Sequence, residues 1–344
     1  MQVIFYIIYL AIVNTPIFCW DLSSFAPNDS PIGQVVVWRN RAFISLPRYK
    51  PGSVKATLIE TLWPDNTYYS QISRRKILSQ AVTTLNRAYP RGNLTLQKEG
   101  HCQSLQNVTA LDVDSMRGWL WVIDSGNAIC WPKVVVYDLR SNEELWRTDL
   151  ETLNTTVLIS IAADPVVGTC GPRAYVGARN IAFLIVIERN RWWPVYLDVI
   201  KLKSELTPDP VVESIVLSRR EPLLYLTAPD TDLMFSFNLS AIRSLPCPSK
   251  NVVIRQPVSF LGYKLGPSRG LVMDLWSGLH YFLPRDYATV RWDTRRPLSA
   301  ESHSVLLQSY KRLPEVTNMF VDPQWQVWAV VGHNCIRIQK YSFM

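Results

Sequence analysis

The segment 107–139 sets the pattern for the rest of the chain, because it holds three short apolar runs in quick succession. Turn-forming residues, rich in Asp, Ser, Gly and Asn, separate these runs, which lie at 110–113, 119–123 and 134–137. Runs of this length, rich in β-branched and aromatic residues, predict the strands of an antiparallel meander. Each strand is too short to be stable alone, so the meander must pack against other sheets.

The same plan returns along the chain at a spacing of roughly 50 residues, close to the period of a propeller repeat. Further copies begin near residues 161, 215, 271 and 319, and one copy fits upstream between 35 and 59. Six copies without a linker predict an all-β fold, a six-bladed β-propeller in a single domain. Propellers often close by pairing the two chain ends within one blade, so we expect the strand at 35–38 to complete the last blade.

The N-terminus carries an apolar stretch, residues 3–13, that is too short to span a bilayer and typical of the core of a signal peptide. No Lys or Arg precedes it. We expect cleavage near Trp20, so that residues 1–20 are a leader and residues 21–344 form the propeller. No other stretch is long and apolar enough for a membrane helix. The chain is therefore expected to be secreted and extracellular, with no membrane span.

Cysteines and glycosylation sequons fit this expectation. Cys19 falls in the leader, which leaves Cys102, Cys130, Cys170, Cys247 and Cys335. Most of them are expected to pair in an oxidising compartment, but the sequence leaves their connectivity open. Five Asn-x-Ser/Thr sites are acceptors if the chain is secreted: they are Asn28, Asn93, Asn107, Asn154 and Asn238.

The formal net charge is +8, and the basic residues lie in short, scattered groups. The ordinary interpretation is solvated loop charge. The alternative is a surface that attracts anionic matrix or eggshell polymers. No nucleic-acid-binding module occurs in the sequence, so no nucleic-acid partner is expected.

Few residues suggest catalysis. The string 266–270 has the form Gly-x-Ser-x-Gly around Ser268, but a strand rather than a helix is predicted to follow it, which argues against a nucleophile elbow. The four histidines show no metal-binding spacing, so neither a metal nor another cofactor is expected. His333, in a polar turn, is the histidine best placed for a site. Aspartates recur at strand ends, where their usual role is to cap turns; carboxylates gathered at a propeller mouth are the alternative.

Several motifs also resemble one family, the insect Yellow / major royal jelly proteins. The resemblance extends from about Trp38 to Trp328 and rests on the strings at 41–52, 110–126, 130–139, 170–177, 223–243 and 292–294. It implies a secreted six-bladed propeller. It also implies the disulfides Cys102–Cys170 and Cys247–Cys335, with Cys130 left over.

The resemblance implies a pocket for small aromatic amines at one mouth of the propeller, and it links some relatives to dopachrome conversion in melanin formation. Thr317 matches a small hydroxyl residue of the family's last repeat. The family usually has Ser-Asn-Arg where this chain has Val-Gly-His at 331–333. Thr317 and His333 are therefore the candidate ligand-binding residues, and His333 is the candidate catalytic residue.

Three functions follow from these expectations. The first is binding of small aromatic amines or related precursors during maturation of cuticle, pigment or eggshell. The second is an enzyme that converts dopachrome-like substrates, with His333 and nearby carboxylates as general acid and base. The third is a structural protein of the extracellular matrix or eggshell that acts through its basic surface.

Overall fold

The computed structural model describes residues 17–18, 20–63, 86–153, 157–181, 183–200, 208–246 and 253–339. In this part of the chain the structure consists of strands, with short helices only in connecting segments. These are η1 (Leu94–Gln97), η2 (Glu151–Leu153), α4 (Ser240–Ser244) and η3 (Ala300–Ser302). No helix of the described residues is long and apolar enough to cross a membrane.

The strands form antiparallel meanders in chain order. The first sheet contains β2 (Val35–Trp38), β3 (Arg41–Ser45), β4 (Leu58–Leu62) and β5 (Arg87–Ala88). The second contains β6 (Val108–Asp114), β7 (Trp119–Asp124), β8 (Lys133–Asp138) and β9 (Glu143–Asp149).

An eight-stranded sheet follows. It begins with β10 (Leu158–Ala163), β11 (Arg173–Ala178), β12 (Phe183–Glu188) and β13 (Arg191–Val199). It continues through β17 (Ile254–Tyr263), β16 (Leu233–Asn238), β15 (Leu223–Thr227) and β14 (Ser214–Leu217). The pairing of β13 with β17 is parallel, whereas the others in this sheet are antiparallel.

Two four-stranded sheets complete the described fold. One contains β18 (Arg269–Met273), β19 (Gly278–Leu283), β20 (Ala288–Asp293) and β21 (His303–Gln308). The other contains β22 (Asn318–Val321), β23 (Val327–Val331), β24 (Asn334–Gln339) and β1 (Ile17–Phe18).

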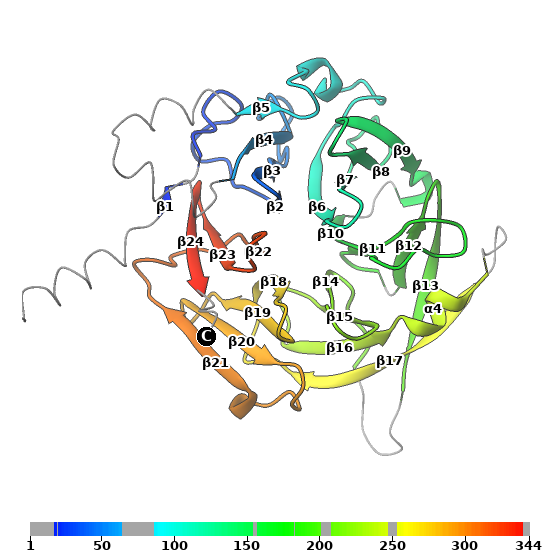
Figure 1. Ribbon diagram of the computed structural model, residues 1–344, viewed down its shortest axis with the longest axis vertical. Coiled ribbons are helices and arrows are strands. Elements are labelled where there is room, and N and C mark those ends of the chain that lie inside the picture. The colour runs from blue at the N-terminus through cyan, green and yellow to red at the C-terminus, as the bar shows by residue number, and fades with distance from the viewer. Residues whose placement is uncertain are drawn as a thin grey trace, which may run out of the picture.

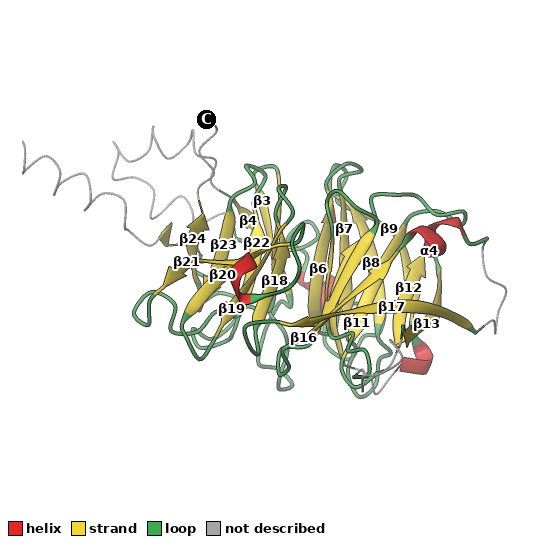
Figure 2. Cartoon of the chain, turned by 90° about the horizontal axis from the view of Figure 1, so that it is seen from below, coloured by secondary structure: helices red, strands yellow, loops and turns green. Residues whose placement is uncertain are grey.

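The sheets stand around a central axis, with the first strand of each meander innermost (Figure 1). Strands β2, β6, β10, β14, β18 and β22 contact one another in turn, and β22 contacts β2, which closes the ring. Seen from the side, the strands run between the two ends of the ring (Figure 2). The fold is therefore an all-β propeller, as predicted.

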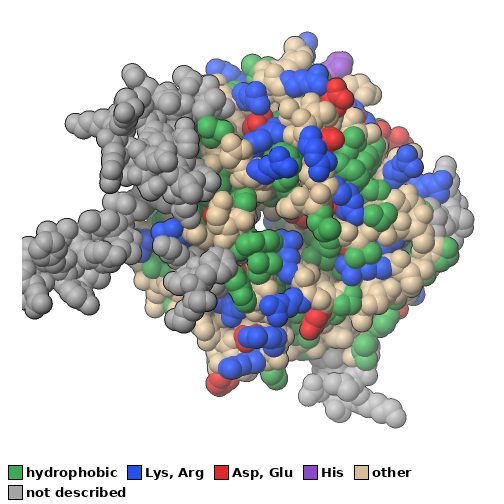
Figure 3. Space-filling view, viewed as in Figure 1, with side chains coloured by type: hydrophobic (Ala, Val, Ile, Leu, Met, Phe, Trp, Pro, Cys, Tyr) green, Lys and Arg blue, Asp and Glu red, His purple; other side chains and the backbone are tan. Residues whose placement is uncertain are grey.

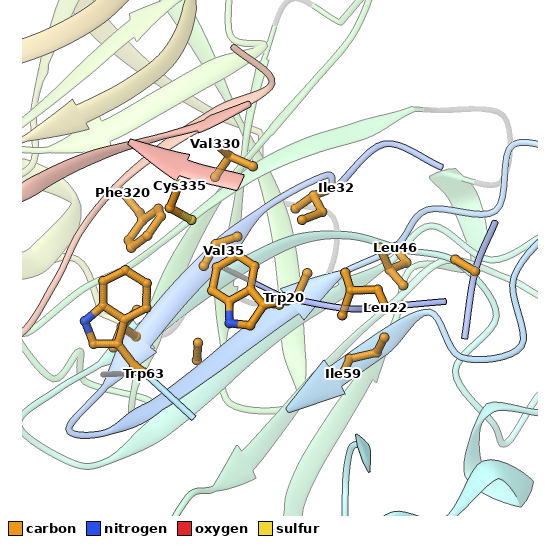
Figure 4. Close-up of a cluster of buried hydrophobic side chains, with 14 of the residues drawn as sticks. Trp20, Leu22, Ile32, Val35, Leu46, Ile59, Trp63, Phe320, Val330 and Cys335 are labelled. Atoms are coloured by element: carbon orange, nitrogen blue, oxygen red, sulfur yellow. The ribbon is translucent and has the colours of Figure 1, made fainter. Parts of the chain in front are cut away.

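Large side chains pack between neighbouring sheets. Trp63 makes an edge-to-face contact with Trp328, with ring centroids 5.0 Å apart, where the first sheet meets the last. Trp20, Phe320 and Cys335 belong to the same cluster (Figure 4). Aromatic rings suit the wedge-shaped gaps between blades because one side chain covers a large apolar area.

The closure of the ring differs from the prediction. Ile17 and Phe18 of β1 pair with Cys335 and Asn334 of β24, so β1 completes the last sheet. The segment 35–38 is instead β2, the innermost strand of the first sheet. Its apolar side chains are needed at the centre of the ring, and a short strand suffices at the outer edge.

One implied disulfide is wrong: Cys102 is bonded to Cys130, not to Cys170. The amino group of Lys133, at the start of β8, forms a buried ion pair with Asp124 and also donates to the Cys102 carbonyl oxygen at 3.1 Å. The hydrogen bond holds the segment around Cys102 against the connection between β7 and β8, which carries Cys130. Cys170 also takes part in a disulfide.

The second implied pairing, Cys247–Cys335, is not tested, because Cys247 lies outside the described residues. Cys335 is buried between the first and last sheets.

Candidate ligand-binding site

A cavity of about 850 Å³ lies at one mouth of the propeller. Its walls come from the beginnings of the innermost strands and from the connections between the second and third strands of several meanders. A narrower channel of about 130 Å³ continues along the axis between the innermost strands. Gln34, Ile215 and Leu271 line both spaces, so the cavity opens into the channel.

Thr317, a predicted site residue, lines this cavity immediately before β22. Its backbone N–H donates to the Val330 carbonyl oxygen, which fixes the residue against β23. Its hydroxyl oxygen is buried and has no hydrogen-bond partner among the described residues, and the same is true of Asn318 Oδ1. Buried polar atoms are nearly always hydrogen-bonded, so these two atoms are unusual; both are shielded from solvent, and the two residues line the cavity through their other atoms.

His333, the other predicted residue, is not among the described residues that line the cavity. It lies in the turn between β23 and β24, at the same end of the ring, and its Nε2 is 2.9 Å from the Ser30 carbonyl oxygen. Its own carbonyl oxygen accepts from the Trp20 backbone N–H. The structure therefore does not bring His333 and Thr317 together, and a catalytic role for His333 stays a prediction.

Other polar residues of the cavity were not identified from the sequence. The hydroxyls of Thr109 and Ser125 are hydrogen-bonded to each other at 2.7 Å. Arg269 and Glu315 form an exposed ion pair at 2.8 Å on the wall. The sequence contains a signal for such residues, because several innermost strands begin with polar residues and continue with apolar ones.

One carboxyl group faces the axial channel. Asp112, on β6, accepts hydrogen bonds from the backbone N–H groups of Ala163 and Val113. Burial raises the pKa of Asp112 to about 6, while Arg219, at the far end of the channel, favours its charged form. A carboxyl group with such a pKa gains and loses protons near neutral pH.

The Gly-x-Ser-x-Gly string forms no nucleophile elbow, as expected, because β18 follows it directly. Ser268 is buried, and its hydroxyl accepts a hydrogen bond of 2.6 Å from the Lys264 amino group. Burial lowers the pKa of Lys264 to about 8. Ser268 is not among the described residues that line the cavity, so a substrate there does not meet its hydroxyl.

The aspartates at strand ends cap turns. Asp114, Asp274 and Asp322 each accept backbone N–H groups from the turn that follows. No group of three His, Cys, Asp or Glu side chains in the described residues is arranged to hold a metal ion.

The sequons occupy different settings. Asn28 and Asn238 are exposed, and Asn93 is exposed but caps η1 through its side chain. Asn107 is half-buried, accepts from the Arg48 backbone N–H and lines the cavity. Asn154 lies outside the described residues. Glycosylation of all five stays a prediction.

Comparison with known proteins connects this structure to a family. The sequence pattern described as "Major royal jelly protein" matches residues 106–342, more than half of the chain. A relative from Drosophila melanogaster, "Dopaminechrome tautomerase", is 32% identical over 152 residues, which cover 40% of this chain and 29% of the relative. The chain thus spans less than a third of that relative's length.

Two solved structures match this chain at low identity, and the first of them shares its fold. Virginiamycin B lyase from Staphylococcus aureus is 9% identical, with a TM-score of 0.50, over 88% of this chain and 78% of that one. The beta-propeller domain of Cps50 (Swd1) from Myceliophteria thermophila is 11% identical, with a TM-score of 0.49, over 93% of this chain and 99% of that one. The family match covers most of the propeller, and this chain belongs to the major royal jelly protein family.

Proposed function

We propose that this protein is secreted and binds a small aromatic amine or a related precursor in the mouth cavity, during maturation of cuticle, pigment or eggshell. The observation that carries the proposal is the cavity of about 850 Å³ at the propeller mouth, whose lining includes Thr317 and Asn318. The Thr317 hydroxyl and Asn318 Oδ1 are shielded and unpartnered in the free protein, and on binding they turn toward an amine or catechol hydroxyl that supplies the hydrogen bonds they lack. Membership of the family and the Cys102–Cys130 disulfide support an extracellular setting.

The test is calorimetric titration with dopamine and serotonin, comparing wild type with T317V. The substitution removes a hydroxyl that makes no bond in the free protein, so folding stability should hold or rise. Loss of one ligand hydrogen bond should weaken binding about tenfold.

The matched control is T61V, because the Thr61 hydroxyl is also buried and unpartnered but lies on β4, outside the cavity. T61V should bind as wild type does. Absence of binding to wild type, or equal binding by T317V, would refute the proposal.

A second candidate is conversion of a dopaminechrome-like substrate, favoured by the similarity to dopaminechrome tautomerase over 152 residues. Tautomerisation moves a proton between two atoms of the substrate and needs no oxidant. Asp112, in the channel below the cavity, is the carboxyl group suited to exchange that proton, through water if the substrate stays in the cavity.

The assay is the disappearance of dopaminechrome with purified protein beside a heat-denatured sample. D112N should lower turnover at least tenfold. Loss of a general acid or base usually costs about a hundredfold or more, and water in the channel can replace part of that contribution. H333A tests the catalytic role predicted for His333 from the sequence, and unchanged turnover would remove that assignment. Turnover no greater than in the denatured sample would leave the binding function, or a structural role in the matrix.

The proposal extends to the mature form of the chain. We count the eight-stranded sheet as two blades, because it joins two four-stranded meanders through the β13–β17 pair, and the propeller then has six blades. Trp20 is only 2% exposed and packs on Trp63. We therefore propose that the leader is cleaved on the N-terminal side of Ile17, so that the mature chain keeps both β1 and Trp20.

A further inference from the structure

The end of the propeller opposite the cavity differs from the cavity end in the side chains that it exposes. In each meander the connections between the first and second strands, and between the third and fourth, lie at this end, since alternate strands run in opposite directions. α4, which links β16 to β17, marks the same end and lies along the upper edge in Figure 2.

Exposed arginines are concentrated at this end, in connections of several meanders. They are Arg39, Arg140, Arg189, Arg191, Arg219, Arg220, Arg295 and Arg296. Figure 3 shows this face, with Lys and Arg side chains around a small central opening. Because these arginines are spread over the whole face, they do not form a pocket for a single small anion.

We call Arg39, Arg140, Arg189 and Arg219 the arginine face, because none of them forms a salt bridge with any described residue. Arg220 forms none either, but its guanidinium group donates to the Leu275 carbonyl oxygen. Arg39 lies over the Trp38 ring, with its guanidinium carbon 4.4 Å from the centroid. This contact leaves the edge of the guanidinium group available for hydrogen bonds.

The described carboxylates form no salt bridge with the arginine face, although the channel carboxyl group of Asp112 interacts electrostatically with Arg219. Asp114, Asp164 and Asp274 are buried there and are occupied by turn N–H groups and by arginines outside the arginine face. The exposed Glu143 and Glu144 pair with Arg91 and Arg147.

Asp138 and Asp293 are half-buried at this end. Asp138 accepts the Arg140 backbone N–H, and Asp293 pairs with Arg295. Glu221 and Glu301 are the remaining exposed carboxylates there in the described residues. A positive field therefore remains, and arginine binds sulfate and carboxylate groups through paired hydrogen bonds.

We propose that the arginine face binds a sulfated polysaccharide that lies across the end of the propeller. A linear polyanion can contact cations spread over several connections at once, which a small anion cannot do. The disulfide favours a protein of an oxidising compartment such as the extracellular space, and this setting favours a polysaccharide over an intracellular nucleic acid as the polyanion. This inference goes beyond the proposed function and uses the opposite end of the molecule.

The experiment measures heparin binding by wild type, by R39Q/R140Q/R189Q/R219Q, and by the control K50Q/K55Q/K98Q/K311Q. The control lysines are exposed and lie in connections at the cavity end. Each variant loses four positive charges, so the net charge falls from +8 to +4 in both. The heparin measurement contains no dopamine and does not depend on the cavity. A negative result would therefore count against this inference and not against the proposed function.

The arginine variant should bind heparin about tenfold or more weakly at physiological salt, and its affinity should depend less steeply on salt concentration. The control should stay within about twofold of wild type, since long-range charge is screened beyond about 8 Å at that salt. Both variants should unfold at the wild-type temperature, because surface substitutions of this kind change stability little.

Three results would overturn the inference. One is equal loss of affinity in both variants, which would reduce the effect to net charge. Another is absence of heparin binding by wild type. The third is tighter binding of wild type to phosphatidylserine vesicles or duplex DNA than to heparin, which would give the face a different partner.

Discussion

At the scale of single residues, the recurring aspartates connect local sequence to tertiary structure. One oxygen caps the turn that follows, as the sequence predicts, and the other binds a group that only the fold supplies. For Asp322 that group is the Trp328 indole N–H at 2.8 Å, and for Asp274 it is the His280 ring and the Arg291 guanidinium. The turn is thereby tied to the next strands of its own meander.

Asp112 gives a prediction at this scale because its carboxyl group is held in the channel with a pKa raised from 3.8 to about 6. A raised pKa means that ionisation destabilises the fold, so the stabilisation present below pH 4 is lost as the pH rises through 6. D112N should therefore be about 1–2 kcal/mol more stable than wild type at pH 7.5, allowing for screening by channel water, and show no such gain at pH 4.

Urea unfolding at pH 4, 6 and 7.5 measures this difference. D286N is the control, because Asp286 is exposed in the connection between β19 and β20. A gain for D112N that is the same at all three pH values would contradict the assignment.

At the scale of elements, the sequence predicted the strands in the middle of each sheet better than the strand at its outer edge. β7 and β8 are almost wholly buried, so their apolar runs are nearly continuous and easy to recognise. β9 and β21 lie at the outer edges of their sheets, where only one residue of the two strands is buried, and their mixed polarity gave no strand signal. An outer strand needs hydrogen bonds to its neighbour more than it needs apolar side chains.

The Cys102–Cys130 bond gives a prediction at the scale of elements. The two residues are 28 positions apart, and release of that loop in C102S/C130S should lower the free energy of unfolding by about 3 kcal/mol. Denaturant unfolding without reductant measures the loss. Mass spectrometry of unreduced proteolytic peptides should find Cys102 linked to Cys130, and a Cys102–Cys170 peptide would show that the pairing is different.

At the scale of the whole molecule, the ring depends on how the two chain ends meet. The cluster between the first and last sheets joins Trp20 and Trp63 from the N-terminal region to Phe320 and Trp328 near the C-terminus (Figure 4). A propeller is stable only when each sheet is covered on both faces, so this junction stabilises the entire ring.

Trp20 is the residue that tests the junction. W20A should lower the free energy of unfolding by about 3–5 kcal/mol, because it leaves a cavity between two sheets. W131A should cost less than about 1 kcal/mol, since Trp131 is 48% exposed. N-terminal sequencing of the secreted protein should find Trp20 retained, and a mature chain that begins at Asp21 with wild-type stability would contradict the prediction.

The sequence by itself determined the strands, the turns and their repetition, because alternation of apolar runs with turn residues is a local property. Thr317 was identified by the family resemblance, and the structure places it in the cavity lining. Tertiary structure alone decided that Cys102 meets Cys130, that His333 bonds to Ser30, and that β1 completes the last sheet. It also decided that arginines from separate connections share one face. These pairings join residues far apart in the chain, and their proximity depends on the angles between sheets, which no local pattern encodes.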